Sequence, residues 1–256
     1  MYIDTHTHLY SDAFDEDRDQ MIQRALDAGV KQLLMPNIDT SSIEVMHALE
    51  QKFPNVCLPM MGLHPCSVKE NWEKELDQIE GKLFEGKYIA VGEIGIDLYW
   101  DQSFLKEQKF VFAKQIEWAK KLNLPIVIHA RSSFQEIFEV MDQHYDESLR
   151  GVFHCFTGGL EELEKIRTYK GFYLGIGGVL TFKKSGLDEV LRSTKLEELL
   201  LETDSPYLAP TPHRGKRNES SYLPLVAEKL SDIFELSVHE IAKITSQNAK
   251  KCFNLS

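Results

Sequence analysis

A regular alternation between short apolar runs and amphipathic stretches constrains the fold of this chain more than any other feature of its sequence. Eight apolar runs have the length of single strands, and the stretches between them carry apolar residues at helical spacing. The expected strands are Tyr2–Thr5, Val30–Pro36, Val56–Met61, Tyr88–Gly92, Pro125–Ile128, Gly151–Phe153, Phe172–Ile176 and Leu199–Thr203. Strands that alternate with helices in this way are typical of parallel βαβ units.

The number of these units and the chain length together favour one barrel. The expected helices are Phe14–Ala28, Ser41–Lys52, Trp72–Leu83, Phe104–Leu122, Phe134–Tyr145, Leu160–Thr168, Leu187–Thr194, Tyr222–Phe234 and Val238–Cys252. Eight strand–helix units in 256 residues are typical of the (β/α)8 TIM barrel, an α/β fold. A doubly wound sheet is the alternative, although no Gly-rich phosphate loop follows the first strand. No linker or change in composition marks a boundary, so we expect a single domain over residues 1–256.

Charge and cysteine content narrow the class of protein. The formal net charge of −11 argues against an extended nucleic-acid-binding face, which is usually basic. It does not exclude a polyanionic substrate, because divalent cations and a few local basic residues can reverse the field within one cleft. The apolar runs are too short to cross a membrane, and no signal peptide opens the chain. The four cysteines lack paired spacing, which is typical of reduced thiols, so we expect a cytoplasmic protein with no membrane partner.

Side chains that can bind a metal ion follow or end five of the expected strands. They are His6, His8, Glu93, His129, His154 and Asp204. In a parallel barrel the carboxyl ends of all strands meet at one rim, where active sites are built. A single histidine at a strand end is more often a hydrogen-bonded structural residue than a ligand. Six candidates at the same rim nevertheless indicate a metal site, and His6 and His8 point to the same side of their strand.

The mixture of imidazole and carboxylate groups bears on the ion and its chemistry. Imidazole with carboxylate suits Zn²⁺ and related ions, whereas carboxylate and water suit Mg²⁺ or Mn²⁺. We expect two divalent ions of this group, with positions left open for water. A bound ion lowers the pKa of its water toward ~7, and a carboxylate at the rim can take the proton. We therefore expect Asp204 and Glu93 to be the catalytic residues.

Other polar side chains near the same rim are candidates for contact with the substrate. The predicted substrate-binding residues are His64, Arg131, Glu202, Arg214 and Arg217. Arg214 and Arg217 suit a phosphate group, because a guanidinium matches phosphate oxygens in pairs; the alternative is that they pair with nearby acids. Glu202 can instead hold the second ring nitrogen of a metal ligand, or be an ordinary polar residue at a strand end. Asp97 is interpreted as a helix cap rather than as a site residue.

Several motifs between residues 4 and 219 together resemble the signature blocks of the TatD family of metal-dependent deoxyribonucleases. They read DTHTHL, MGLHP, VGEIGID, IHAR, FHCFTG, LGIGGVLTFKKS, LLLETDSPYLAP and HRGKRNE. The resemblance implies a TIM-barrel hydrolase of the metal-dependent amidohydrolase type that cleaves DNA phosphodiesters in the cytoplasm. It also implies metal ligation by the same six residues. The chain departs from the family pattern at Cys66, Ser132, Ser133 and Ser220, which affects the expected shape of the substrate cleft.

Three hypotheses about function remain open at this point. The first is a divalent-metal-dependent deoxyribonuclease, exonucleolytic, that acts on single-stranded DNA or strand ends with a metal-activated water as nucleophile. The second keeps this machinery for another ester or amide, as in D-aminoacyl-tRNA deacylation. The third is a non-catalytic metal-binding module, which the open coordination positions disfavour. The basic loop from Pro212 to Glu219 favours the first, because a neutral amide has no need of it.

Overall fold

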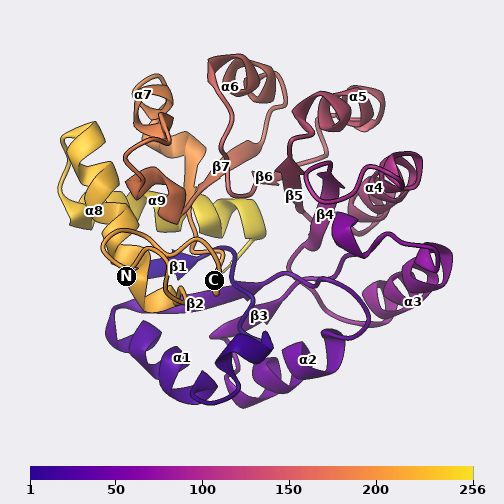
Figure 1. Ribbon diagram of the computed structural model, residues 1–256, viewed down its shortest axis with the longest axis horizontal. Coiled ribbons are helices and arrows are strands. Elements are labelled where there is room, and N and C mark those ends of the chain that lie inside the picture. Colours follow the sequence, from indigo (N-terminus) through magenta and orange to yellow (C-terminus); the bar gives the residue numbers. More distant parts are fainter. Residues whose placement is uncertain (256) are drawn as a thin grey trace.

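The computed structural model describes residues 1–255 and confirms the (β/α)8 arrangement. Helices form an outer ring around a set of parallel strands, as Figure 1 shows. The strands are β1 (Tyr2–Asp4), β2 (Val30–Met35), β3 (Cys57–Pro59), β4 (Val91–Asp97), β5 (Ile126–Arg131), β6 (Gly151–Phe153), β7 (Phe172–Ile176) and β8 (Leu199–Leu201). The helices are α1 (Arg18–Asp27), α2 (Ile43–Lys52), α3 (Trp72–Glu85), α4 (Leu105–Leu122), α5 (Phe134–His144), α6 (Leu160–Arg167), α7 (Leu187–Leu191), α8 (Leu223–Phe234) and α9 (Val238–Phe253).

Backbone hydrogen bonds close the strands into a barrel. Ladders join β1 to β3 in one group and β4 to β8 in another. Between β3 and β4, the amide of Met61 donates to the carbonyl of Ala90 over 3.2 Å. Between β8 and β1, the amide of Thr5 donates to the carbonyl of Leu201 over 3.0 Å. Both gaps are thereby bridged, so the carboxyl ends of all eight strands surround one opening.

The barrel interior is apolar at the amino ends of the strands. Each strand or its flank contributes one residue to a buried cluster: Ile3, Leu34, Met60, Ala90, Val127, Val152, Tyr173 and Leu200. Helix α9 adds Ala249, Cys252 and Phe253 to this cluster. Its Asn248 side chain donates to the carbonyls of Leu196 and Leu199, where β8 begins. Since α9 covers this end of the barrel, polar chemistry is confined to the opposite rim.

The fourth strand differs from the sequence prediction. The prediction ended it at Gly92, whereas β4 begins at Val91 and continues to Asp97. Gly95 has a φ of +141°, and a Cβ there would lie 2.1 Å from the carbonyl oxygen of His129. Gly95 therefore permits β4 to pass close to β5. Glu93 and His129 consequently lie within paired strands, not in the loops that follow them.

Within the described residues, no helix combines the length and hydrophobicity that a membrane crossing requires. The longest, α4, is amphipathic and carries seven charged residues along its outer side.

Candidate metal centre

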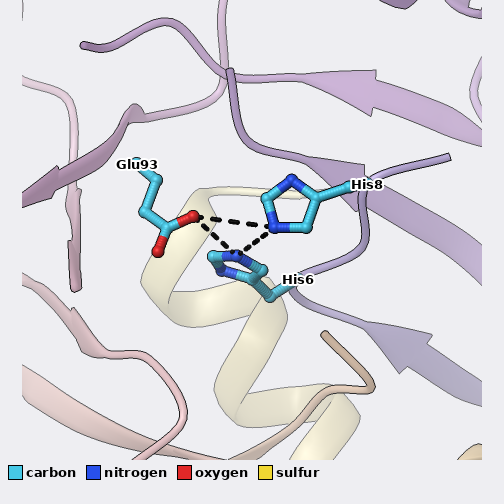
Figure 2. Close-up of side chains that lie close together, drawn as sticks. All are labelled: His6, His8 and Glu93. Carbon is cyan, nitrogen blue, oxygen red and sulfur yellow. Dashed lines mark hydrogen bonds and ion pairs between the residues drawn. The ribbon is translucent and has the colours of Figure 1, made fainter. Parts of the chain in front are cut away.

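The side chains of His6, His8 and Glu93 converge at the centre of the rim (Figure 2). The two histidines follow β1 and the glutamate comes from β4, 85 or more positions away in the chain. His6 Nε2 lies 3.3 Å from His8 Nε2 and 3.1 Å from Glu93 Oε2. All three side chains are almost entirely buried, with at most 4% of any residue exposed. Two imidazole nitrogens and one carboxylate oxygen thus face a common point.

The second oxygen of Glu93 faces another group of histidines. Glu93 Oε1 lies 2.8 Å from His129 Nδ1, 3.3 Å from His154 Nε2 and 3.4 Å from His64 Nε2. One carboxylate therefore stands between two sets of imidazoles. This arrangement is the main electrostatic feature of the rim.

Asp204 completes the set of predicted ligands. Its Oδ1 lies 3.4 Å from His8 Nε2 and 3.7 Å from His6 Nε2. The backbone amide of Asp204 donates to the carbonyl of His6 over 2.9 Å, which fixes the loop after β8 against the segment after β1. Its side chain is 14% exposed, more than that of His6, His8 or Glu93. Asp204 therefore lies on the solvent side of the cluster.

The hydrogen bonds of Tyr10 determine which nitrogen of His8 is free. The hydroxyl of Tyr10 donates to the carbonyl of Pro36, so its oxygen accepts from His8 Nδ1 at 2.8 Å. His8 therefore carries its proton on Nδ1 and presents the lone pair of Nε2 to the cluster. Tyr10 was not identified from the sequence, where it reads as an ordinary apolar residue after the histidine motif.

Glu202 and Asp97 orient two further histidines in the same way. Glu202 Oε1 accepts from His154 Nδ1 at 3.0 Å, and Asp97 Oδ2 accepts from His129 Nε2 at 2.8 Å. His154 therefore presents Nε2 to Glu93, and His129 presents Nδ1. A carboxylate behind an imidazole fixes its orientation and raises its basicity, which is the usual support for a metal ligand. Gly175 leaves the space for Glu202, since a Cβ there would lie 2.1 Å from Glu202 Oε2.

His64 has the opposite arrangement. Its Nδ1 accepts from the backbone amide of Cys66 over 3.1 Å, so in the neutral ring the proton lies on Nε2. His64 therefore presents an N–H to the cluster rather than a lone pair. This geometry supports a contact with an acceptor on the substrate, the role that we predict for it, and not a place among the metal ligands.

The charges of the cluster favour a cation. Burial raises the pKa of the Glu93 carboxyl, but His6, His64 and His154 lower it more, and it lies well below its usual range. Burial lowers the pKa of His154, yet Glu202 and Glu93 outweigh this and raise it to about 10. The carboxylates of this rim therefore stabilise positive charge in a place that water scarcely reaches.

Hydrogen bonds within residues 1–255 leave some polar atoms of the cluster without a partner. His8 Nε2, Glu93 Oε2 and Asp204 Oδ1 all present lone pairs, and His8 Nε2 lies 3.7 Å from the glutamate oxygen and 3.4 Å from the aspartate oxygen. Within the described residues, His6 Nδ1 and Glu202 Oε2 are buried without any hydrogen-bond partner. Imidazole nitrogens with carboxylate oxygens are a donor set that suits Zn²⁺ and other first-row divalent ions. The residues present thus fit a divalent cation.

Two glutamines of α4 hold the strand ends that carry this chemistry. The Gln115 side chain accepts from the amide of Leu63 at 2.7 Å and donates to its carbonyl, next to His64. Gln108 makes the same pair of bonds with the backbone of Asp97. Both are buried, and their spacing of seven residues places them on one helix face. These two glutamines were not identified from the sequence. They could have been found as polar residues on the otherwise apolar face of the expected helix Phe104–Leu122.

We expect that replacing Gln115 with leucine lowers the free energy of unfolding by about 1–3 kcal/mol, because the buried amide and carbonyl of Leu63 lose their partner. Denaturant unfolding in the presence of EDTA measures this without a contribution from bound metal. The matched control is Gln135→Leu on the exposed side of α5, which should change stability by less than about 0.5 kcal/mol. Equal effects at the two positions would contradict the anchoring role.

The predicted substrate-binding residues lie at different depths. Arg131 is exposed, and its guanidinium lies 3.9 Å from the ring centre of Tyr99. Arg214 stacks on Phe182 at 4.0 Å and lines a cavity of about 570 Å³ together with Lys183 and Lys184.

Two members of the predicted substrate-binding set have partners within the protein. Arg217 pairs with Asp17 through both terminal nitrogens, at 2.7 and 2.8 Å, so its guanidinium is not free for a phosphate. Glu202 is completely buried behind His154 and cannot touch a substrate. The structure thus agrees with the alternative interpretation of each residue. Arg217 pairs with a nearby acid, and Glu202 supports a histidine.

Comparison with known proteins places this arrangement in a family. A family model described as TatD related DNase matches residues 3–254. A Bacillus subtilis protein named YabD, an uncharacterized metal-dependent hydrolase, is 36% identical and is aligned over 100% of both chains. A Pantoea vagans protein named TatD, a 3'-5' ssDNA/RNA exonuclease, is 32% identical over 99% of each chain. The crystal structure of YjjV, a TatD homologue from Escherichia coli, superimposes with a TM-score of 0.92 at 28% identity and covers 100% of this chain and 98% of that one.

Proposed function

This chain belongs to the family of TatD-related DNases, and we propose that it is a metal-dependent hydrolase that removes nucleotides from the ends of single-stranded DNA or RNA. The observation that carries the proposal is the convergence of lone pairs from His8, Glu93 and Asp204 at the open end of the barrel. A substrate that is single-stranded is supported by the name of the Pantoea vagans relative. The carboxyl ends of all eight strands surround one opening, and such an opening suits the end of a strand better than the middle of a duplex.

The ligands divide into two groups about Glu93. His6, His8 and Asp204 would hold one divalent ion with Glu93 Oε2, and His129 and His154 would hold a second with Glu93 Oε1. The chemistry that divalent ions supply in such a place is Lewis-acid stabilisation of phosphate charge and ionisation of water at neutral pH. Mg²⁺, Mn²⁺ and Zn²⁺ all remain candidates, because the donor set contains both imidazole and carboxylate.

Asp204 is placed to take a proton. Burial raises the pKa of its carboxyl, but the neighbouring imidazoles of His8, His154 and His6 lower it below its usual range. The carboxylate is therefore ionised at neutral pH, and its exposed side faces the position from which water and substrate enter. A proton acceptor positioned at the reacting group contributes to rate in the manner of general base catalysis. His64, with its proton on Nε2, can donate to a phosphate oxygen beside Glu93.

The cavity lined by Arg214, Lys183 and Lys184 would hold the phosphate backbone. It adjoins Thr211 in the loop after β8, the same loop that carries Asp204. Three cationic side chains in one depression reverse the negative field of a chain whose net charge is −11. This local charge is the feature that favours a phosphodiester over a neutral amide.

We expect Arg214→Ala and Arg217→Ala to have different effects. Arg214→Ala should raise KM for single-stranded DNA by about tenfold, because a charge-assisted contact with phosphate is lost. Arg217→Ala should leave KM within about twofold and lower the free energy of unfolding by about 1 kcal/mol or less, since its pair with Asp17 is partly exposed. Steady-state kinetics and urea unfolding of both variants measure the difference. A larger KM effect at Arg217 than at Arg214 would contradict these assignments.

The proposed function is tested by incubating the protein with end-labelled single-stranded DNA and RNA. Mononucleotides should be released with added Mg²⁺, Mn²⁺ or Zn²⁺, and EDTA should stop the release. A panel of esters, lactones and amides, including an aminoacyl-tRNA ester, is assayed in parallel. Metal-dependent turnover of a member of that panel, with no cleavage of DNA or RNA, would overturn the proposal in favour of another hydrolase activity.

A further inference from the structure

Two large aromatic side chains stand exposed beside the metal centre. Trp100 is 70% exposed and Tyr99 is 57% exposed, in the loop between β4 and α4. Their rings meet edge to face with centres 4.9 Å apart. The guanidinium of Arg131 lies 3.9 Å from the centre of the Tyr99 ring and 5.3 Å from that of Trp100. One exposed aromatic residue is ordinary, but two exposed rings in contact with each other and with a guanidinium form a patch that suits a ligand, and we call Tyr99, Trp100 and Arg131 the aromatic cluster.

The aromatic pair is fixed to the catalytic rim by Asp97. Asp97 Oδ1 accepts from the backbone amides of Tyr99 and Trp100 at 3.0 and 3.2 Å, while Oδ2 holds His129. The backbone of Leu98 donates to the carbonyl of Arg131 over 3.0 Å. One carboxylate thus links the orientation of a predicted metal ligand to the loop that carries both rings.

Arg131 brings the third member of the cluster from the neighbouring strand. Arg131 and His129 are two residues apart in β5, so they lie on the same side of that strand, about 7 Å apart along it. Register pairing places Arg131 opposite Asp97 of β4. A nucleotide whose phosphate lies at the metal centre can therefore extend its base over this cluster.

We propose that Tyr99, Trp100 and Arg131 form a stacking platform for a nucleobase next to the scissile phosphate of a single-stranded substrate, an inference that rests on the proposed function. Aromatic rings and guanidinium planes both stack on bases, and they do so with little sequence preference because every base has a π-face. In a duplex the bases are paired and stacked on one another and are not available to the platform. The platform therefore selects unpaired ends without reading their sequence.

The platform is tested with two matched oligonucleotides, one with bases and one of the same length built from abasic sugars. Trp100→Ala should raise KM for the base-bearing strand by roughly 5- to 100-fold and leave KM for the abasic strand unchanged. Trp100→Phe, which keeps a ring, should recover most of the loss. The matched control is Phe84→Ala, because Phe84 is also exposed and lies beneath a cation, with Lys121 Nζ 4.7 Å from its ring centre, but at the far end of α3 and α4.

Tryptophan fluorescence measures binding of the bases independently of hydrolysis. The chain has three tryptophans, of which Trp118 is buried and Trp72 is partly buried. A base stacked on the exposed Trp100 should therefore quench a large part of the accessible emission. Quenching should follow addition of the base-bearing strand and be lost in Trp100→Ala. If Trp100→Ala hydrolysed each of the two strands with the same KM as the wild type, the stacking platform would be overturned but the proposed function would stand. Absence of metal-dependent hydrolysis of either strand would instead overturn the proposed function, and quenching would still report whether bases bind.

Discussion

Replacing Asp204 with asparagine is expected to lower kcat for single-stranded DNA by between about 100-fold and 10,000-fold. The substitution keeps the shape of the side chain but removes its ability to take a proton. It also withdraws a negative charge that lies 3.4 Å from His8 Nε2. The fold should survive, because the backbone amide of Asp204, which bonds to the carbonyl of His6, is unchanged. Single-turnover kinetics at saturating metal separate the loss of proton transfer from weaker binding.

Asp146→Asn is the control for this substitution. Asp146 lies between α5 and β6, on the face of the barrel opposite to the rim, and pairs with Lys120. It should retain full activity, and its metal content should equal that of the wild type. If the Asp204 variant turned over within about tenfold of the wild type, and did so in EDTA, neither the proton-accepting role nor the metal dependence would survive.

The convergence of the predicted metal ligands could be expected from the sequence because it follows from topology. Once the chain is a parallel barrel, the residues after β1, β6 and β8 must meet at one rim, whatever their separation in sequence. His6, His154 and Asp204 were placed by this rule. The exact ends of the strands were less predictable. The fourth strand was expected to end at Gly92, whereas Gly95 permits β4 to continue close beside β5, which depends on contacts that a linear pattern does not contain.

The supporting contacts were harder to predict than the ligands. The interpretation of Asp97 as a helix cap is wrong, because Asp97 ends β4 and α4 begins only at Leu105. One of its oxygens accepts from the amides of the following loop, and the other holds His129. That second contact crosses from β4 to β5 and depends on their register. Arg217 illustrates the same limit, because its partner Asp17 is 200 positions away. A basic loop beside an active rim suggests phosphate binding, and only the fold shows which of its arginines is already paired.

The position of Glu93 explains why the two groups of histidines belong to one centre. Its two oxygens face different groups, and its anionic form is stabilised by the imidazoles on both sides. Asp97 behind His129 and Glu202 behind His154 then add charge at greater distance. We therefore expect Glu93 to have the largest influence on cation binding and the outer carboxylates Asp97 and Glu202 to have a smaller one.

Glu93→Gln is therefore expected to abolish metal binding and hydrolysis together. The amide has the same size but no charge, and its NH2 group would point a hydrogen at nitrogens or oxygens that otherwise present lone pairs. In the wild type, Mn²⁺ at about 100 times its Kd should stabilise the fold by about 2.7 kcal/mol and raise Tm by roughly 5–10 °C. This increase should disappear in the variant, and elemental analysis should find metal lost from both groups, since both share Glu93.

Glu202→Gln is the comparison for Glu93→Gln, because it should weaken metal binding without abolishing it. Glu202 touches the centre only through His154 Nδ1, and an amide oxygen can still accept that hydrogen bond, so metal affinity should fall by only about 10- to 100-fold. The Tm increase should then return when the Mn²⁺ concentration is raised by the same factor, whereas no concentration should restore it in Glu93→Gln. If Glu93→Gln kept its metal while Glu202→Gln lost it, the cation would be held by His6, His154 and Glu202 instead, and Glu93 would not be the residue around which the site is built.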